Sequence, residues 1–386
     1  MSNIHYEWIY ENGGPAIRLR LLFNNSKHKP TLEIENISAD LLRMDEVQKY
    51  LRYLDGFNTQ ANEKKELEHL IHYYGDMCID KFFPVLMDFG FRSGIEEIDR
   101  ALIPVKKLFM EMQAKDYDYC FFYGLMLMRV FFITGFVNQE IIDTMNNRIN
   151  ALHTAAKERI YDIFQDKSKL PKPPKQWLEH GVIKDEMNPF SKRAEIPLPT
   201  IYDVSAMAYY QQYNKDPMIQ QKIEDIMEYI LTPEFQALPE GYGLLWVKER
   251  RIYHACGWNP LLPMYDSYKR PGHLGNNAIL NYLTMMSCYK NAIKSKWFID
   301  GLNYIDQFKT ERGTYLFPKE YLSRKCSAPG FESNFMGFNT NKHELYLNSE
   351  NMKLRYKERE ALIRELISTV NVLEIKERYL GHQRSR

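Results

Sequence analysis

The stretch from Arg250 to Pro260, RRIYHACGWNP, places a histidine and a cysteine two residues apart. With His273 downstream, His254 and Cys256 form the only close group of imidazole and thiol side chains, which are ligands that zinc prefers. Only one cysteine contributes, and residues two apart share one side of a strand but not one face of a helix. We therefore expect no metal or other cofactor. Zinc stays an alternative to a partly buried thiol beside a hydrogen-bonded histidine.

Two aspartates are candidates for acid chemistry. Asp203 follows a proline-rich approach and precedes an apolar stretch, and Asp266 lies in an irregular, aromatic-rich segment. A carboxylic acid that stays protonated in an apolar cavity could protonate a substrate, and His254 and Tyr253 are further candidates for proton transfer. The alternative for Asp203 is a helix N-cap, because aspartate at the start of a helix accepts backbone hydrogen bonds.

Aromatic side chains in and near the same segment could line the mouth of a cavity. Glycines and prolines interrupt residues 250–277 repeatedly, yet the segment is apolar, as expected of chain that borders a pocket. Aromatic faces there could stabilise positive charge on a substrate. The alternative is a connector between helices that is held by its own aromatic side chains. The candidate substrate-binding residues are Tyr202, Trp246, Trp258, Tyr265 and His273.

The N-terminal region shows a period of two. Apolar residues alternate with arginines in IRLRLL and with glutamates in LEIEN, within residues 17–37, and a polar, turn-forming connector separates the two runs. Alternation over such short runs is typical of strands. The sequence therefore predicts a small N-terminal β-hairpin region over residues 1–40.

Beyond this region the apolar residues follow a helical period, which predicts a mainly α domain over residues 41–386. A proline-rich, basic segment at 167–200 cannot form one continuous helix, and we expect it to cross one rim of the fold. The C-terminal segment at 347–378 is charged and amphipathic, which predicts a last helix with a solvated polar face.

Two pairs of similar segments predict repeated helical hairpins. The segments that begin at Leu86 and Val130 share a Gly-Phe step, a polar turn and an amphipathic helix. The segments that contain Tyr229 and Tyr304 each consist of a helix, a turn, a second helix and a glycine turn. Such hairpins bury their apolar faces only against neighbours, which favours either an open solenoid or a closed ring of helix pairs.

Hairpins closed by glutamine, glycine and aromatic residues, here Gln307, Gly313, Tyr315 and Phe317, resemble the repeats of α/α-toroid proteins, namely terpenoid cyclases and protein prenyltransferase β subunits. The stretch PTIYDVSAMA is also similar to the YDTAWVA stretch of plant-type class II diterpene cyclases. The resemblance covers about residues 85–320 and implies an α/α toroid with an apolar central cavity. The sequence contains neither DxDD nor DDxxD, so the likeness is to the scaffold, which does not fix function.

Composition limits the classes of partner. An apolar fraction of 45% and a formal net charge of +1 are typical of a globular chain that has no general attraction for nucleic acid. Five scattered cysteines without a CxxC pair, and no secretory signal at the N-terminus, predict a cytoplasmic protein. The apolar stretch at 120–137 contains Arg129, which favours a buried core helix over a membrane span or other membrane contact.

Three functional hypotheses follow. The first is a terpenoid-cyclase-like enzyme that acts on an apolar, isoprenoid-like molecule by acid-initiated chemistry. The second is a non-catalytic α-repeat protein that binds a peptide or protein partner on a concave surface. The third is a zinc-dependent modifying enzyme. A deep apolar cavity with an inward carboxylate would favour the first, an exposed groove the second and a metal site the third.

Overall fold

The protein is mainly helical, as the sequence predicts, and has a small antiparallel sheet of two strands. A computed structural model gives this architecture. It describes residues 3–24, 31–60, 71, 78–114, 118–263, 278–322 and 342–384.

The N-terminal region is helical, and the predicted β-hairpin is wrong. α1 (Asn3–Asn12), α2 (Pro15–Asn24) and α3 (Thr31–Leu42) occupy the described part of residues 1–40. In α2, Leu19 is fully buried and Arg20 is only 5% exposed. A helix that is enclosed on several sides buries charged as well as apolar positions. The alternation of the two types therefore did not report a strand with one wet face.

The segments with a Gly-Phe step each form two helices. α4 (Asp45–Gln60) precedes them, and they contain the pairs α6 (Ile79–Asp88) with α7 (Glu96–Ala114) and α8 (Asp118–Thr134) with α9 (Gln139–Glu158). In each pair a glycine with positive φ follows the first helix, Gly90 at 93° and Gly135 at 86°. Glycine reaches this conformation without the strain of a Cβ atom, so it turns the chain back sharply.

The later segments also form helix pairs, as the sequence predicts. They contain α10 (Ile201–Tyr210) with α11 (Pro217–Ile230), and α13 (Ile279–Met286) with α14 (Lys296–Asp306). The remaining short helices are α12 (Pro233–Gln236), η8 (Ala292–Lys294), η9 (Lys319–Tyr321), η11 (His343–Leu345) and η12 (Asn351–Lys353).

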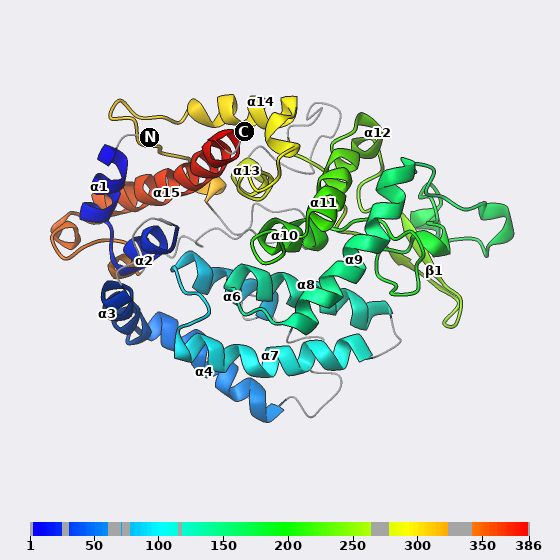
Figure 1. The fold of residues 1–386 in the computed structure, drawn as a ribbon, viewed down its shortest axis with the longest axis horizontal. Coiled ribbons are helices and arrows are strands. Elements are labelled where there is room, and N and C mark those ends of the chain that lie inside the picture. The colour runs from blue at the N-terminus through cyan, green and yellow to red at the C-terminus, as the bar shows by residue number, and fades with distance from the viewer. Residues whose placement is uncertain are drawn as a thin grey trace.

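The proline-rich segment at 167–200 contains no α-helix, as its prolines predict. It forms three short 3-10 helices, η3 (Lys167–Lys169), η4 (Lys175–Trp177) and η5 (Asp185–Met187). Beside it lies the hairpin of β1 (Leu244–Val247) and β2 (Ile252–Ala255), which a bridge between Val182 and Leu244 joins to the segment. In Figure 1 this hairpin lies at the edge of the molecule, away from its centre.

α8 is a core helix, as predicted for the apolar stretch at 120–137. Its side chains from Phe121 to Thr134 are all buried, and Arg129 among them is 1% exposed. The Arg129 Nε donates to Ser205 Oγ on α10 at 3.0 Å. None of the helices in the described ranges has the length and apolar character that a membrane crossing requires.

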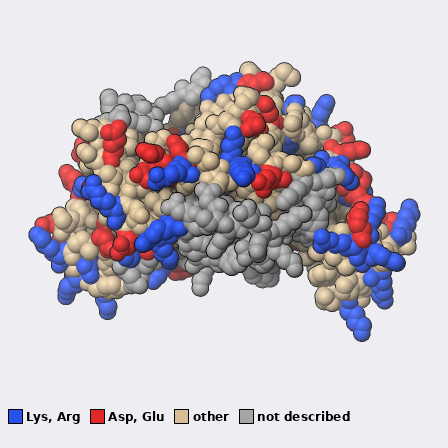
Figure 2. All heavy atoms as spheres, turned by 90° about the horizontal axis from the view of Figure 1, so that it is seen from below, with Lys and Arg blue, Asp and Glu red and all other residues tan. Residues whose placement is uncertain are grey.

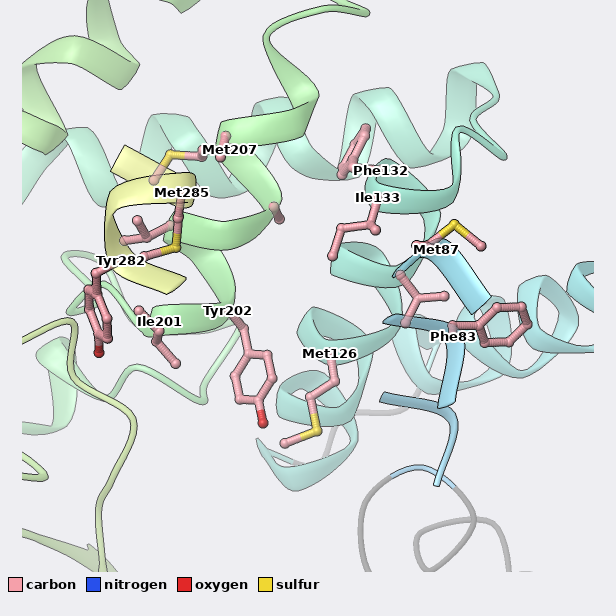
Figure 3. Packing of buried hydrophobic residues seen from close by; sticks show 14 of the residues in the cluster. Phe83, Met87, Met126, Phe132, Ile133, Ile201, Tyr202, Met207, Tyr282 and Met285 are labelled. Carbon is pink, nitrogen blue, oxygen red and sulfur yellow. The ribbon is translucent and has the colours of Figure 1, made fainter. Parts of the chain in front are cut away.

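Six helices contact one another in a closed circuit around the centre of the molecule (Figure 1). In order of contact they are α2, α6, α8, α10, α13 and α15 (Tyr356–Arg384), and α15 returns to α2. α1, α3, α7, α9 and α14 pack on the outside of these helices. Figure 3 shows buried side chains that α6, α8, α10 and α13 contribute to the interior, including Met126, Met207 and Met285.

The C-terminal helix corrects a second expectation. Its polar face is not simply solvated, because Glu374 is 8% exposed and Asn371 and Ser368 are fully buried. Because α15 completes the circuit of helices, polar as well as apolar side chains on it contact other parts of the protein. The N-terminal region also contacts the segment before α15, where Gly13, between α1 and α2, pairs with Leu347 through an isolated bridge.

The turn after α6 offers a matched pair of glycines that tests this packing. A Cβ atom on Gly90 would lie 2.5 Å from the Arg20 amide nitrogen on α2, whereas a Cβ on Gly94, at φ 99°, would meet nothing within 4 Å. We expect Gly94→Ala to lower the free energy of unfolding by about 1–2 kcal/mol, the strain of a left-handed residue. Gly90→Ala should lower it clearly more, because the backbone of α2 must also move. Equal losses in urea denaturation would contradict the close approach of this turn to α2.

Candidate functional site

Asp203 is the third residue of α10 and completes a capping box at the start of this helix, whose N-cap is Thr200 and not Asp203. Its side chain accepts from the Thr200 amide and hydroxyl at 2.8 Å each, and its own amide donates back to Thr200 Oγ1 at 3.2 Å. This capping box fixes the start of α10. The Asp203 carboxylate also accepts from Nε and Nη2 of Arg148 at 2.8 and 2.9 Å. Four hydrogen bonds therefore use both of its oxygens, and Asp203 is fully buried.

Tyr202 and Trp258 lie together in a packed aromatic cluster. The centroid of the Phe122 ring is 5.7 Å from that of Tyr202 and 4.5 Å from that of Trp258. The Phe190 ring packs on the rings of Phe122 and Trp258. Trp258 has φ 64°, and its carbonyl accepts from the Ile201 amide at 2.7 Å. Trp258 therefore packs on Phe122 and Phe190, which both lie outside residues 250–277, so its partners are not aromatic residues of its own segment.

Tyr253, His254 and Trp246 lie on the small sheet and belong to another cluster. Tyr253 faces Trp246 across the two strands, with ring centroids 4.7 Å apart, and its hydroxyl donates to the Pro171 carbonyl. This cluster is separate from the main core that contains Tyr202. His254 is half-buried, and burial followed by the charge of Arg250 lowers its pKa. The structure therefore does not bring the described candidate acids and bases together.

Cys256 is a buried thiol whose sulfur lies 3.9 Å from the Gly257 carbonyl oxygen. Burial raises the pKa of this thiol well above its ordinary value, so that it stays protonated at neutral pH. Within the described ranges, no cluster of three or more His, Cys, Asp or Glu side chains could hold a metal ion. The predicted residues Tyr265, Asp266 and His273 lie outside the described residues.

The helices of the closed circuit surround a cavity of about 50 Å³. All six helices contribute side chains to its lining, and Arg92, which follows α6, also belongs to the lining. A cavity of this size has room for roughly three to five waters. Its lining consists of Arg20, Pro84, Met87, Asp88, Arg92, Ile133, Ser205, Tyr209, Asn281, Thr284, Met285, Asn371, Glu374 and Arg378. The lining of this cavity therefore combines charged and polar groups with an apolar side.

Arg20 forms the most connected group of the lining. Its Nε and Nη2 donate to the two Glu374 oxygens at 2.5 and 2.9 Å, and Nη2 also donates to Asn371 Oδ1 at 2.7 Å. Its Nη1 lies 3.9 Å from Asp88. Burial opposes the ionisation of Glu374, but Arg20 outweighs it and holds the pKa of this carboxyl below its ordinary value. The pair thus stays charged and joins α2 to α15.

Arg92 and Arg378 have carbonyl oxygens but no carboxylate as partners. Arg92 Nη1 donates to Met87 and Phe91 at 2.8 and 2.6 Å, and Arg378 Nη1 donates to Thr284 at 2.9 Å. Neither forms an ion pair within the described part of the chain. Burial lowers the pKa of Arg92, and Arg20 adds to this effect. Both guanidinium groups border the cavity in the field of Glu374, which favours their charged forms, but within the described residues neither forms an ion pair with it.

Several buried polar atoms of the lining have no hydrogen-bond partner among the residues that the structure describes. They are Nδ2 and Oδ1 of Asn281, Nδ2 of Asn371 and Nη1 of Arg20. Asn281 is 7% exposed and Asn371 is fully buried. Leaving a buried polar group unsatisfied costs about 1–3 kcal/mol, so these groups call for water, an ion or a ligand in the adjoining cavity.

The toroid resemblance implies a central cavity, but sequence reasoning expected an apolar one and named none of the polar residues that line this cavity. Its polar residues come from positions as distant as Arg20, Asn281 and Arg378, and no motif of adjacent residues connects them. The available signal was weak but physical. Arginine and asparagine occur inside the apolar runs IRLRLL and ILNYLTMM, where a polar side chain needs a buried partner.

The chain matches no known family model, no curated protein and no solved structure. A function for it must therefore be argued from its own residues. On the visible face in Figure 2, basic and acidic side chains are interspersed. With a formal net charge of +1 for the whole chain, the surplus of arginines in the cavity is a local feature.

A structural role for Asp203 predicts a loss of stability when its partner is removed. Asp203→Ala and Arg148→Met should each lower the free energy of unfolding by about 3–5 kcal/mol, because each leaves an uncompensated buried charge. The double variant should lose less than the sum of the two. Urea denaturation measures this, and Arg43→Met, at the exposed pair with Asp40, is the control that should leave stability unchanged. An unaltered stability of Asp203→Ala would return Asp203 to the list of candidate acids.

The buried thiol predicts slow chemistry at Cys256. In the folded protein at pH 8, iodoacetamide should modify Cys256 roughly tenfold more slowly than the half-buried Cys288, because only the thiolate reacts and burial disfavours it. Peptide mass spectrometry after timed labelling gives both rates. Addition of EDTA should not change them. Faster labelling of Cys256 with EDTA present would instead support the zinc hypothesis.

Proposed function

We propose that this protein binds a small oxygen-rich anion, a carboxylate or a phosphate, in the cavity at the centre of its ring of helices. The observation that carries the proposal is the pair of arginines, Arg92 and Arg378, that border the cavity without a carboxylate partner. Guanidinium groups bind carboxylates and phosphates through paired, charge-assisted hydrogen bonds. An anion between them would supply the charge that the described residues lack.

The unsatisfied amides support the same proposal. Asn371 Nδ2, Asn281 Nδ2 and Arg20 Nη1 are donors without acceptors, and all three belong to the lining. An oxygen-rich anion offers several acceptor positions at once. A few convergent polar groups in a cavity that packed helices hold in place are typical of a small-molecule site.

We also propose that the closed circuit of helices is an α/α toroid, because its order of contact leads from α2 around to α15 and back. The cavity favours a different ligand from the one that the toroid resemblance implies. An apolar, isoprenoid-like molecule would leave the arginines and amides unpaired in a dry site. The proposed acid Asp203 also has both oxygens engaged by Arg148 and Thr200.

A comparison of sodium salts at constant ionic strength tests the proposal. Relative to chloride, at least one of glycolate, lactate, propionate and phosphate should raise the melting temperature of the wild-type protein. At a concentration of 100 times Kd, the added stability is about 2.7 kcal/mol. Arg92→Met and Arg378→Met should each remove most of the effect, because each deletes a guanidinium that contacts the anion.

Arg43→Met is the matched control, since Arg43 is an exposed arginine on the surface. It should retain the full increase in melting temperature. The proposal fails if none of the four anions stabilises the wild type. It also fails if the stabilisation persists in both cavity variants, since the anion would then bind elsewhere.

A further inference from the structure

We infer that the anion is a small hydroxy acid, with one carboxylate and at least one hydroxyl group. This inference rests on the proposed function and defines the chemical class of its ligand. It follows from features of the same cavity: the amide of Asn281, the balance of charge in the lining, its acidic and hydroxyl groups, and its size with the apolar part of its lining.

The Asn281 side chain requires more than an acceptor. Its Nδ2 is a donor and its Oδ1 an acceptor, and both atoms are buried without a hydrogen-bond partner in the described part of the chain. Acetate or another simple carboxylate could accept from Nδ2, but it has no proton to donate to Oδ1 at neutral pH. A hydroxyl group both donates and accepts. Asn281 on α13 therefore selects a ligand that carries O–H as well as negative charge.

The charges of the lining favour a single negative charge on the ligand. The lining contains three arginines, Arg20, Arg92 and Arg378, and two acids, Asp88 and Glu374, which leaves 3 − 2 = +1. Behind the lining, Arg129 is buried near Asp80, whose carbonyl accepts from it, and these two charges offset each other. A monocarboxylate neutralises the site. A zwitterionic amino acid would leave one buried positive charge uncompensated.

Acidic and hydroxyl groups of the lining also suit a hydroxylated ligand. Asp88 and Glu374 are acceptors, and Ser205, Thr284 and Tyr209 carry hydroxyls that both donate and accept. Burial raises the pKa of Tyr209, so its hydroxyl keeps its proton at neutral pH. A site made only for an inorganic anion would have no use for the two carboxylates.

The size of the cavity limits the carbon skeleton. With room for roughly three to five waters, it fits a molecule of about two to four carbon atoms. Pro84, Met87, Ile133 and Met285 give part of the lining an apolar surface against which such a skeleton packs. Figure 3 shows three of them, Met87 on α6, Ile133 on α8 and Met285 on α13.

Isothermal titration calorimetry with matched probes tests the inference. Lactate and propionate have the same charge and carbon number and differ only in one hydroxyl. We expect lactate to bind the wild-type protein about tenfold more tightly, the effect of one or two hydrogen bonds to buried partners. Serine and inorganic phosphate should bind more weakly than lactate, because their charges do not match the site.

The variant Asn281→Leu keeps the branching and the number of heavy atoms of the side chain and removes both polar atoms. It should lower the affinity for lactate about tenfold and leave that for propionate unchanged, so that the two become equal. Asn303→Leu, at an exposed asparagine on α14, should retain the preference. If Asn281→Leu does not fold, Asn281→Thr, which keeps a hydroxyl, should retain part of the preference, and the wild-type comparison stands without any variant.

The outcomes separate the inference from the proposed function. Equal binding of lactate and propionate by the wild type would overturn the hydroxy-acid inference and leave anion binding intact. Tighter binding of serine would overturn it in favour of an amino acid. Tighter binding of phosphate would overturn it in favour of an inorganic anion or phosphate ester. Binding of none of the probes would refute the proposed function as well.

Discussion

The ion pair between Arg20 and Glu374 holds together the first and last helices of the central circuit. It joins α2 to α15 through two short charge-assisted hydrogen bonds, and Asn371 on α15 adds a third. Because both partners are buried, the pair stabilises the fold only while both are present. The turn after α6 lies against the backbone beside Arg20, where only a glycine fits. α2 around Arg20 thus determines three things: the closure of the circuit, the position of α6 and the shape of the cavity.

The protein contains two buried arginine–carboxylate groups that differ in completeness. The Asp203 carboxylate has four donors, and its partner Arg148 also donates to the carbonyls of Pro189 and Leu198. The group around Arg20 leaves Nη1 and the neighbouring Asn371 amide without partners. A complete network specifies structure, whereas an incomplete one beside a cavity is a site where a ligand can supply the missing bonds. Asp203 therefore belongs to the fold alone, whereas Glu374 both closes the circuit of helices with Arg20 and borders the proposed site.

The sequence was a good guide to the helices and a poor guide to the site. Apolar periodicity and the Gly-Phe steps at Gly90 and Gly135 predicted the helix pairs, because a hairpin turn and an amphipathic face are local properties. The alternation of residue types in α2 predicts a strand. This prediction is wrong, because a helix that is enclosed on several sides buries both residue types. The cavity depends on which helices close the circuit, and that is a property of the whole chain. Residues such as Asn281 and Arg378 gain their meaning only when α13 and α15 meet.

The location of the charge surplus also limits how the protein can select an anion. A chain with a formal net charge of +1 and interspersed surface charges exerts little long-range attraction on small anions. Selection must therefore occur inside the cavity, among buried side chains, where a guanidinium interacts more strongly than at the surface. Side chains from six packed helices form this lining, so it is largely preorganised and the ligand has little to reorder. Such a site discriminates between ligands by the match of donors and acceptors. The Asn281 amide, whose two polar atoms have no partner among the described residues, therefore restricts the choice of ligand more than any single charge.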